Sequence, residues 1–252
     1  MRLMLKKIAL LMGVLVLVSL DLPPKKITVY LIGDSTISIK ETKAYPETGW
    51  GMPFANFFDS TVVVDNRAKN GRSTRTFISE NRWQPIVDQL KEGDYVFIQF
   101  GHNDESKEKV DRYTTPEQYK TNLSKFIDEA RAKKAIPVLL TPVARRKFKD
   151  GVQQETHVEY SPLARQIAKE KNVAFIDLDV KSTELLQKYG EEKSKLLFLQ
   201  LEAGEHPNYP EGKNDNTHFN ELGARVIAQL VLAEVKSLKL ELAERTVKPP
   251  AK

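Results

Sequence analysis

The sequence predicts an α/β fold that is built on a parallel β-sheet. Five apolar runs of strand length recur along the chain, rich in Val, Ile, Phe and Tyr, and such runs are typical of strands buried on both faces. Segments with helical periodicity lie between them, which favours βαβ units with right-handed crossovers. The 252 residues suffice for one large domain, and no repeat or composition shift marks a boundary within it.

The strand predictions come from the apolar runs, and they cover residues 27–33, 61–66, 94–101, 136–142 and 173–178. Helices are expected where apolar residues recur every three or four positions, over residues 79–93, 115–135, 161–172, 179–198 and 220–244. Thr115 and Pro116 provide a cap and a first-turn proline, and Gly93 suits a helix end. The segment 179–198 is expected to be a helix, a break and a second helix. Residues 39–53 and 199–219 are expected to be irregular.

The N-terminus predicts an export signal over residues 1–20, followed by a single domain over residues 21–252. Basic residues precede an apolar run from Ile8 to Leu20, as in a secretory leader. The run is short for a membrane span, which needs roughly 20 apolar residues. No small-x-small triplet precedes Asp21, so an uncleaved anchor is the alternative to cleavage. The sequence therefore predicts a secreted or periplasmic protein, with no membrane contact beyond such an anchor.

Composition excludes several classes of function. The chain contains no cysteine, which excludes disulfides, thiolate nucleophiles and cysteine-based metal sites. Part of the net charge of +5 comes from Arg2, Lys6 and Lys7, ahead of the apolar run. No block of Lys and Arg stands beside aromatic residues, so no nucleic-acid partner is expected.

Four clusters of polar residues are candidates for a site. Three follow predicted strands: Gly33-Asp34-Ser35, Asn70-Gly71-Arg72-Ser73 and Gly101-His102-Asn103-Asp104. The carboxyl ends of parallel strands share one edge of a sheet, so these three clusters should converge. The fourth cluster holds Asp215 and His218 in a loop before the last helix, and it need only fold over that edge.

Together these groups could perform nucleophilic catalysis. Ser35 is a weak nucleophile without a base. On a turn or a first helical turn, Asp215 would reach the Nδ1–H group of His218 and leave Nε2 to take the serine proton. The amides of Ser35 and Gly71 and the side chain of Asn103 could stabilise an oxyanion. Taken singly, each residue also fits a bland role, as a helix cap, a turn residue or a glycine with positive φ.

In this order the motifs resemble those of the SGNH (GDSL-type) hydrolases. The four blocks read "GDSTIS", "NGRSTRTF", "GHND" and "DNTH", and the similarity spans residues 27–235. The leucine of the GDSL name is Thr36 here. The stretches "YPETGWG", "TPVARR" and "DNTHFNELGA" are similar to the rhamnogalacturonan acetylesterase branch of that family.

The resemblance implies a flavodoxin-like three-layer α/β/α sandwich with a five-stranded parallel sheet. It implies Ser35 as nucleophile, His218 as base and Asp215 as its orienting acid, with Ser35, Gly71 and Asn103 forming the oxyanion hole. The implied reaction is removal of O-acetyl groups from a polysaccharide or oligosaccharide, with pectic rhamnogalacturonan favoured. No metal and no organic cofactor are implied.

Candidate substrate contacts are Asp34, Trp50, Arg72 and His102. Trp50 lies in a glycine-rich loop and offers either a flat surface for a sugar ring or a side chain for packing. Arg72 adjoins Gly71 and could meet the carboxylate of an acidic sugar, as could Arg75, Arg145 and Arg146. Solvated surface is the alternative for all four arginines.

Two further readings stay open at this point. One is an SGNH esterase that acts on acetylated xylan, on peptidoglycan or on lysophospholipid. The other is a non-catalytic carbohydrate-binding protein on the same scaffold, although binding alone does not need a base beside a serine. A monomer is expected.

Overall fold

The computed structural model describes residues 25–248, and the predicted leader over residues 1–20 lies outside them. Five parallel strands form the central sheet, in the order β2-β1-β3-β4-β7. The strands are β1 (Ile27–Gly33), β2 (Val62–Asn66), β3 (Tyr95–Gln99), β4 (Ile136–Leu140) and β7 (Ala174–Ile176). All five lie within the predicted runs. The prediction of a parallel sheet is therefore confirmed.

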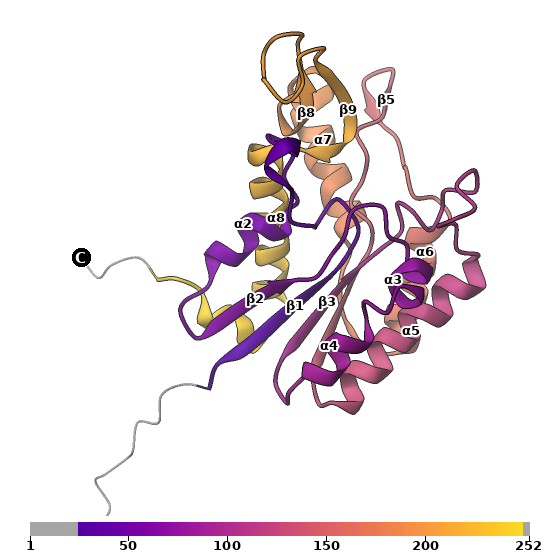
Figure 1. Ribbon diagram of the computed structural model, residues 1–252, viewed down its shortest axis with the longest axis vertical. Coiled ribbons are helices and arrows are strands. Elements are labelled where there is room, and N and C mark those ends of the chain that lie inside the picture. Colours follow the sequence, from indigo (N-terminus) through magenta and orange to yellow (C-terminus); the bar gives the residue numbers. More distant parts are fainter. Residues whose placement is uncertain (1–24, 249–252) are drawn as a thin grey trace, which may run out of the picture.

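Helices cover both faces of the sheet, as Figure 1 shows. One face carries α2 (Gly51–Phe54), α7 (Leu178–Ser194) and α8 (Glu221–Ser237), which share one apolar core with the sheet. A second core lies under α3 (Thr74–Ser79), α4 (Gln84–Gln89), α5 (Pro116–Ala132) and α6 (Tyr160–Glu170) on the opposite face. The molecule is thus a three-layer α/β/α sandwich, as predicted.

The sequence explains where α5 begins and which face it buries. Thr115 accepts a hydrogen bond from the Gln118 amide, and the Gln118 side chain accepts one from the Thr115 amide, so that a capping box closes the first turn. The apolar stripe is fully buried: Tyr119, Leu123, Phe126, Ile127 and Ala130. Burial of each large side chain stabilises the fold by about 1.5–3 kcal/mol.

The strand order determines where a site can form. Chain connections leave β1 toward β2 on one side and return to β3 on the other, so the order reverses between β1 and β3. Open α/β sheets bind ligands at such a switch point, beyond the carboxyl ends of the strands. Ser35 and Asn103 follow β1 and β3 at this place.

The segment 199–219, expected to be irregular, contains most of an antiparallel hairpin. Strand β8 (Phe198–Leu201) pairs with β9 (Lys213–Phe219) above the carboxyl edge of the sheet (Figure 1). The sequence of β9, "KNDNTHF", has no apolar alternation because most of the strand is not buried. A second short hairpin, β5 (Phe148–Lys149) with β6 (Val152–Gln153), was not predicted either.

Several helices end earlier than expected. Residues 79–93 contain only the short α4, and α3 precedes it. Gly190 interrupts α7 at φ 76°, which matches the predicted break. Short 3-10 turns, η3 (Lys195–Leu197) and η4 (Glu241–Arg245), follow α7 and α8, and two more, η1 (Thr42–Ala44) and η2 (Ala55–Phe57), flank α2.

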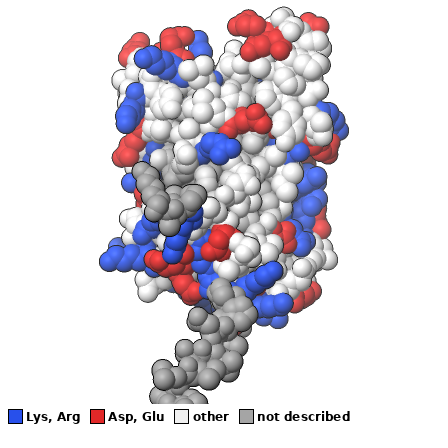
Figure 2. Space-filling model, turned by 90° about the vertical axis from the view of Figure 1, so that its left-hand side faces the viewer, with Lys and Arg blue, Asp and Glu red and all other residues white. Residues whose placement is uncertain are grey.

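The surface carries charges of both signs. On the side of the molecule that lies at the left of Figure 1, basic and acidic side chains are interspersed among uncharged ones (Figure 2). Within residues 25–248, none of the helices combines the length and the apolar character that crossing a bilayer requires.

Candidate active site

Ser35 lies on a tight turn directly after β1. The side chain of Asp34 accepts hydrogen bonds from the amide of Thr36 at 2.9 Å and from its hydroxyl at 2.8 Å, which fixes the turn. Gln99, the last residue of β3, donates to the Thr36 hydroxyl at 2.7 Å. The nucleophile turn is therefore tied to the two central strands.

Ser35, His218 and Asp215 form one hydrogen-bonded chain. The Ser35 hydroxyl donates to Nε2 of His218 at 2.8 Å, and Nδ1–H of His218 donates to Oδ2 of Asp215 at 2.8 Å. Ser35 and His218 lie 183 positions apart in the sequence, and the fold brings their side chains into contact. With Nδ1 protonated, Nε2 presents its lone pair to the serine proton, as a general base requires.

The local conformation of Asp215 and His218 differs from the prediction. The sequence predicted a turn or a first helical turn, but both residues belong to β9. The β8–β9 ladder pairs Phe198 with Phe219 and Gln200 with Asn214, so four residues of β9 (215–218) face one residue of β8. This bulge bends the strand, and Oδ1 of Asp215 accepts the amides of Thr217 at 2.8 Å and of His218 at 2.9 Å.

These contacts also set the charge of Asp215. Burial alone would raise its pKa, but the hydrogen bonds and the nearby imidazole of His218 hold the pKa of the Asp215 carboxyl well below its ordinary value. The carboxylate therefore stays ionised at neutral pH and can stabilise an imidazolium as it forms.

Two backbone amides are directed away from their protein neighbours. The Asp34 carbonyl accepts the Ser38 amide at 3.2 Å, and the Asn70 carbonyl accepts Nη1 of Arg72 at 2.9 Å. In a trans peptide the N–H group points opposite to the carbonyl, so the amides of Ser35 and Gly71 point away from these partners. Among residues 25–248 neither amide donates to another residue. Gly71 has φ +74°, a conformation that favours glycine.

Asn103 completes this group of donors. Its side-chain amide donates to the Arg72 carbonyl at 3.2 Å and keeps a second hydrogen for a ligand. Next to it, Asp104 accepts hydrogen bonds from the amide of Thr74 at 2.9 Å and from its hydroxyl at 2.6 Å. Asp104 is fully buried, and burial raises its pKa to about 7. The sequence placed Asp104 in a candidate cluster with a turn residue as the alternative, and in the structure its side chain joins the loop after β3 to the first turn of α3.

Three predicted substrate contacts are wrong. Trp50 is completely buried, and its indole N–H donates to Gln99 at 2.7 Å, so it has no surface for a sugar. Asp34 is completely buried inside the nucleophile turn. His102 is 5% exposed and packs edge-on against His157, with ring centroids 4.5 Å apart. All three are buried side chains that support the site rather than contact a substrate. Burial also lowers the pKa of His102 well below its ordinary value.

The arginines near the site have protein partners. Arg72 binds Glu80 at 2.9 Å in addition to the Asn70 carbonyl. Arg145 binds Glu105 and donates to the His102 carbonyl at 3.3 Å. Arg146 holds the catalytic strand, because its amide donates to the Asn216 carbonyl at 2.9 Å and its Nη1 to the Asn216 side chain at 3.0 Å. Substrate contact by Arg72 stays a prediction.

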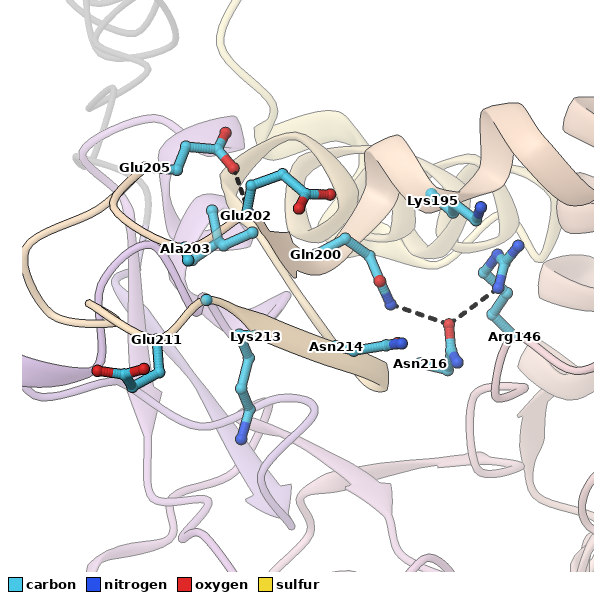
Figure 3. Close-up of a pocket in the computed structure, with 12 residues that line it drawn as sticks. Arg146, Lys195, Gln200, Glu202, Ala203, Glu205, Glu211, Lys213, Asn214 and Asn216 are labelled. Carbon is cyan, nitrogen blue, oxygen red and sulfur yellow. Dashed lines mark hydrogen bonds between the residues drawn. The ribbon is translucent and has the colours of Figure 1, made fainter.

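A polar hollow of about 600 Å³ adjoins the strand that carries Asp215 and His218 (Figure 3). Side-chain amides and charged groups of both signs line it: Gln200, Asn214 and Asn216, with the basic Arg146, Lys195 and Lys213 and the acidic Glu202, Glu205 and Glu211. Gln200 and Arg146 both donate to the side-chain oxygen of Asn216, so this wall is held in place. Within the part of the chain that the structure describes, no three His, Asp or Glu residues gather as a metal site would require.

The sequence is similar to those of known proteins. The model of the GDSL-like Lipase/Acylhydrolase family matches residues 31–226. The chain is 43% identical over 224 residues to rhamnogalacturonan acetylesterase RhgT of Bacillus subtilis, covering 88% of this chain and 95% of RhgT. It is 40% identical over 221 residues to the protein named "Probable rhamnogalacturonan acetylesterase YesY" of the same organism, covering 87% and 97% of the two chains.

A solved structure agrees with these relationships. The crystal structure of YxiM from Bacillus subtilis superposes with a TM-score of 0.75 at 26% identity, over 88% of this chain and 59% of that longer chain. The sequence matches, the fold and the hydrogen-bonded Ser-His-Asp triad all point to one family. This polypeptide chain therefore belongs to the GDSL-like lipase/acylhydrolase family of carboxylic ester hydrolases.

Proposed function

We propose that this protein removes O-acetyl groups from rhamnogalacturonan through an acyl-enzyme on Ser35. The observation that carries the proposal is the 2.8 Å hydrogen bond from the Ser35 hydroxyl to Nε2 of His218, with Asp215 behind the imidazole. The substrate class rests on the names of RhgT and YesY, which align with 88% and 87% of this chain.

The proposed reaction has two halves. The Ser35 oxygen attacks the acetyl carbonyl carbon while Nε2 of His218 takes the hydroxyl proton. The carbonyl oxygen becomes negative and accepts hydrogen bonds from the amides of Ser35 and Gly71 and the side chain of Asn103. His218 then returns the proton to the sugar oxygen, which leaves. In the second half a water gives a proton to His218 and attacks the acetyl carbonyl. As this intermediate collapses, the bond to the Ser35 oxygen breaks, His218 returns the proton to that oxygen, and acetic acid leaves and ionises to acetate.

The surroundings of the triad suit a polymeric sugar. The hollow beside β9 is open to solvent and polar, and its amide and charged side chains can hydrogen-bond hydroxyl and carboxylate groups. Ser35, Asp215 and His218 do not line this hollow of about 600 Å³, so in the proposal it holds sugar units at some distance from the acetylated one.

The test is acetate release from acetylated rhamnogalacturonan by the wild type and by Ser35→Ala, with acetylated xylan and a lysophospholipid as competing substrates. The Ser35→Ala change should lower turnover on the order of 10⁶-fold. Ser60→Ala, at an exposed serine, is the matched control and should keep the full rate. A Ser35→Ala variant that retains its rate would refute the mechanism. Faster turnover of acetylated xylan or of the lysophospholipid would refute rhamnogalacturonan as the substrate. Labelling of Ser35 by a fluorophosphonate would exclude a binding protein without activity.

Secretion and the monomeric state stay part of the proposal. Export rests on the basic and apolar residues 1–20, which lie outside the described residues. Cell fractionation with N-terminal sequencing of the mature protein tests export and cleavage together. Size-exclusion chromatography with light scattering tests the monomer.

A further inference from the structure

A buried lysine lies directly behind the nucleophile turn. The side chain of Lys40 is 1% exposed, and its ammonium makes an ion pair with Glu47 at 2.7 Å. Burying a charge costs free energy unless partners satisfy it, so an ammonium in this position calls for an explanation. The proposed reaction uses neither Lys40 nor Glu47.

The remaining partners of Lys40 lie next to two donors of the oxyanion hole. Its Nζ donates to the carbonyl of Ser35 at 2.5 Å and to the side-chain oxygen of Asn70 at 2.9 Å. The Ser38 hydroxyl donates to the same Asn70 oxygen at 2.5 Å. The Asn70 carbonyl and the Gly71 N–H belong to one peptide group, so the ammonium connects Ser35, which supplies one donor, to the residue that precedes the second donor, Gly71.

We propose that Lys40 is a positioning residue of the oxyanion hole: its buried ammonium bridges Ser35 and Asn70 and thereby sets the spacing between the Ser35 and Gly71 amides. These two residues come from different loops, one after β1 and one after β2. The Arg72 guanidinium holds the Asn70 carbonyl from the exposed side, and Lys40 holds the Asn70 side chain from the buried side. An error of about 1 Å in such positions can cost about 100-fold in rate.

The role concerns geometry more than charge or stability. Glu47 neutralises Lys40 at close range, so the pair adds little net charge behind the hole. A buried ion pair also contributes little net stability, because an apolar pair of similar size is often equally stable. Removal of the whole pair should therefore leave the fold intact while the hole loses its bridge.

The experiment measures kcat and KM on p-nitrophenyl acetate for Lys40→Met and for the double variant Lys40→Met/Glu47→Leu, which leaves no unpaired buried charge. Lys43→Met is the matched control, because Lys43 is 84% exposed in the same loop. We expect kcat to fall 10²–10³-fold in both Lys40 variants, as on loss of one oxyanion donor, with KM changed less than about threefold. Inhibition by an aryl trifluoromethyl ketone, whose serine adduct places a negative oxygen in the hole, should weaken in parallel.

The outcomes separate positioning from a structural role. A kcat within about threefold of wild type, in variants whose circular dichroism shows native folding, overturns the proposal. Equal losses in the Lys43→Met control overturn it as well. If the Lys40 variants do not fold, Asn70→Ala, at an exposed residue, must give the same kcat loss with unchanged KM. The inference rests on ester hydrolysis at Ser35, and activity that survives Ser35→Ala would indicate failure of that function instead.

Discussion

Replacing Asp215 by Asn tests the orientation of the imidazole with little change in shape. Oδ1 of Asp215 accepts the amides of Thr217 and His218 at 2.8 and 2.9 Å, and an Asn oxygen can keep both bonds. The NH₂ group then occupies the Oδ2 position, 2.8 Å from Nδ1 of His218, and directs a donor at it. Nδ1 must accept, so the ring proton moves to Nε2 and faces the Ser35 hydroxyl. His218 can no longer take the serine proton.

The expected loss is large because the tautomer, and not the packing, changes. In the Ser-His-Asp triads of serine proteases the corresponding change lowers kcat about 10⁴-fold. At 1.36 kcal/mol per tenfold, this is about 5 kcal/mol of transition-state stabilisation. KM on p-nitrophenyl acetate should change little, since Asp215 acts through His218 and not on the substrate.

The assay is steady-state hydrolysis of p-nitrophenyl acetate, with circular dichroism to show that the bulged strand persists. Asp111→Asn is the matched control, because the side chain of Asp111 is 69% exposed. A folded Asp215→Asn variant that loses less than tenfold in kcat would show that Asp215 does not set the tautomer. The triad reasoning would then be wrong.

Three further predictions concern residues that support the site. Trp50→Phe leaves the Gln99 side-chain oxygen without its 2.7 Å donor, and the free energy of unfolding measured in urea should fall by about 1–3 kcal/mol. KM on acetylated polysaccharide should stay the same. A raised KM would indicate that Trp50 contacts the substrate. In the folded state the pKa of Asp104 is raised to about 7, so folding is favoured while the carboxyl is protonated. The free energy of unfolding of the wild type should therefore fall by up to about 4 kcal/mol between pH 4 and 7, relative to that of Asp104→Asn. An equal pH dependence of the two proteins in urea unfolding would contradict the raised pKa. Gly71→Ala places a Cβ at φ +74°, 3.2 Å from Nη1 of Arg112, and should cost about 1–2 kcal/mol of stability and lower kcat more than it changes KM; an unchanged kcat would argue against the Gly71 amide as a donor.

The central sheet was predictable because its strands are buried on both faces. Runs such as "ITVYLIG" are continuously apolar, and β3 is buried at all five of its positions. Helical patterns between the runs, such as the one that begins at the Thr115 cap, predict βαβ units, and the resemblance to the SGNH hydrolases implied the three-layer sandwich. The candidate triad was equally accessible, because each of its residues stands in a short motif with its own chemistry.

The β8–β9 hairpin was not predictable from the pattern. Most of β9 is not buried and its residues 213–218 are polar, so neither period of hydrophobicity is present in this strand. The bulge that places Asp215 beside His218 depends on the pairing of Asn214 with Gln200 and of Phe219 with Phe198, which lie 14 and 21 residues earlier in the chain. Tertiary contacts, rather than local propensity, determine this geometry.

Burial of individual residues also escaped prediction. Trp50 in a glycine-rich loop fits a sugar platform as well as a core position, and only the neighbouring Gln99 and Phe54 decide between them. Lys40 reads as an ordinary surface lysine, since its partners Ser35 and Asn70 stand in separate loops. A single sequence gives no sign of such a bridge.

The serine and the histidine are attached to parts of the molecule with different mechanical support. Ser35 follows a strand that is flanked by β2 and β3, whereas His218 lies on β9, which has one pairing strand, β8, and the hydrogen bonds from Arg146 to Asn216. Peripheral units of this kind open at lower free energy than the centre of a domain. Loosening of the β8–β9 pair would carry the imidazole away from a serine that has not moved. Moderate heating or mild denaturant should therefore abolish the esterase activity under conditions in which the central sheet is still folded.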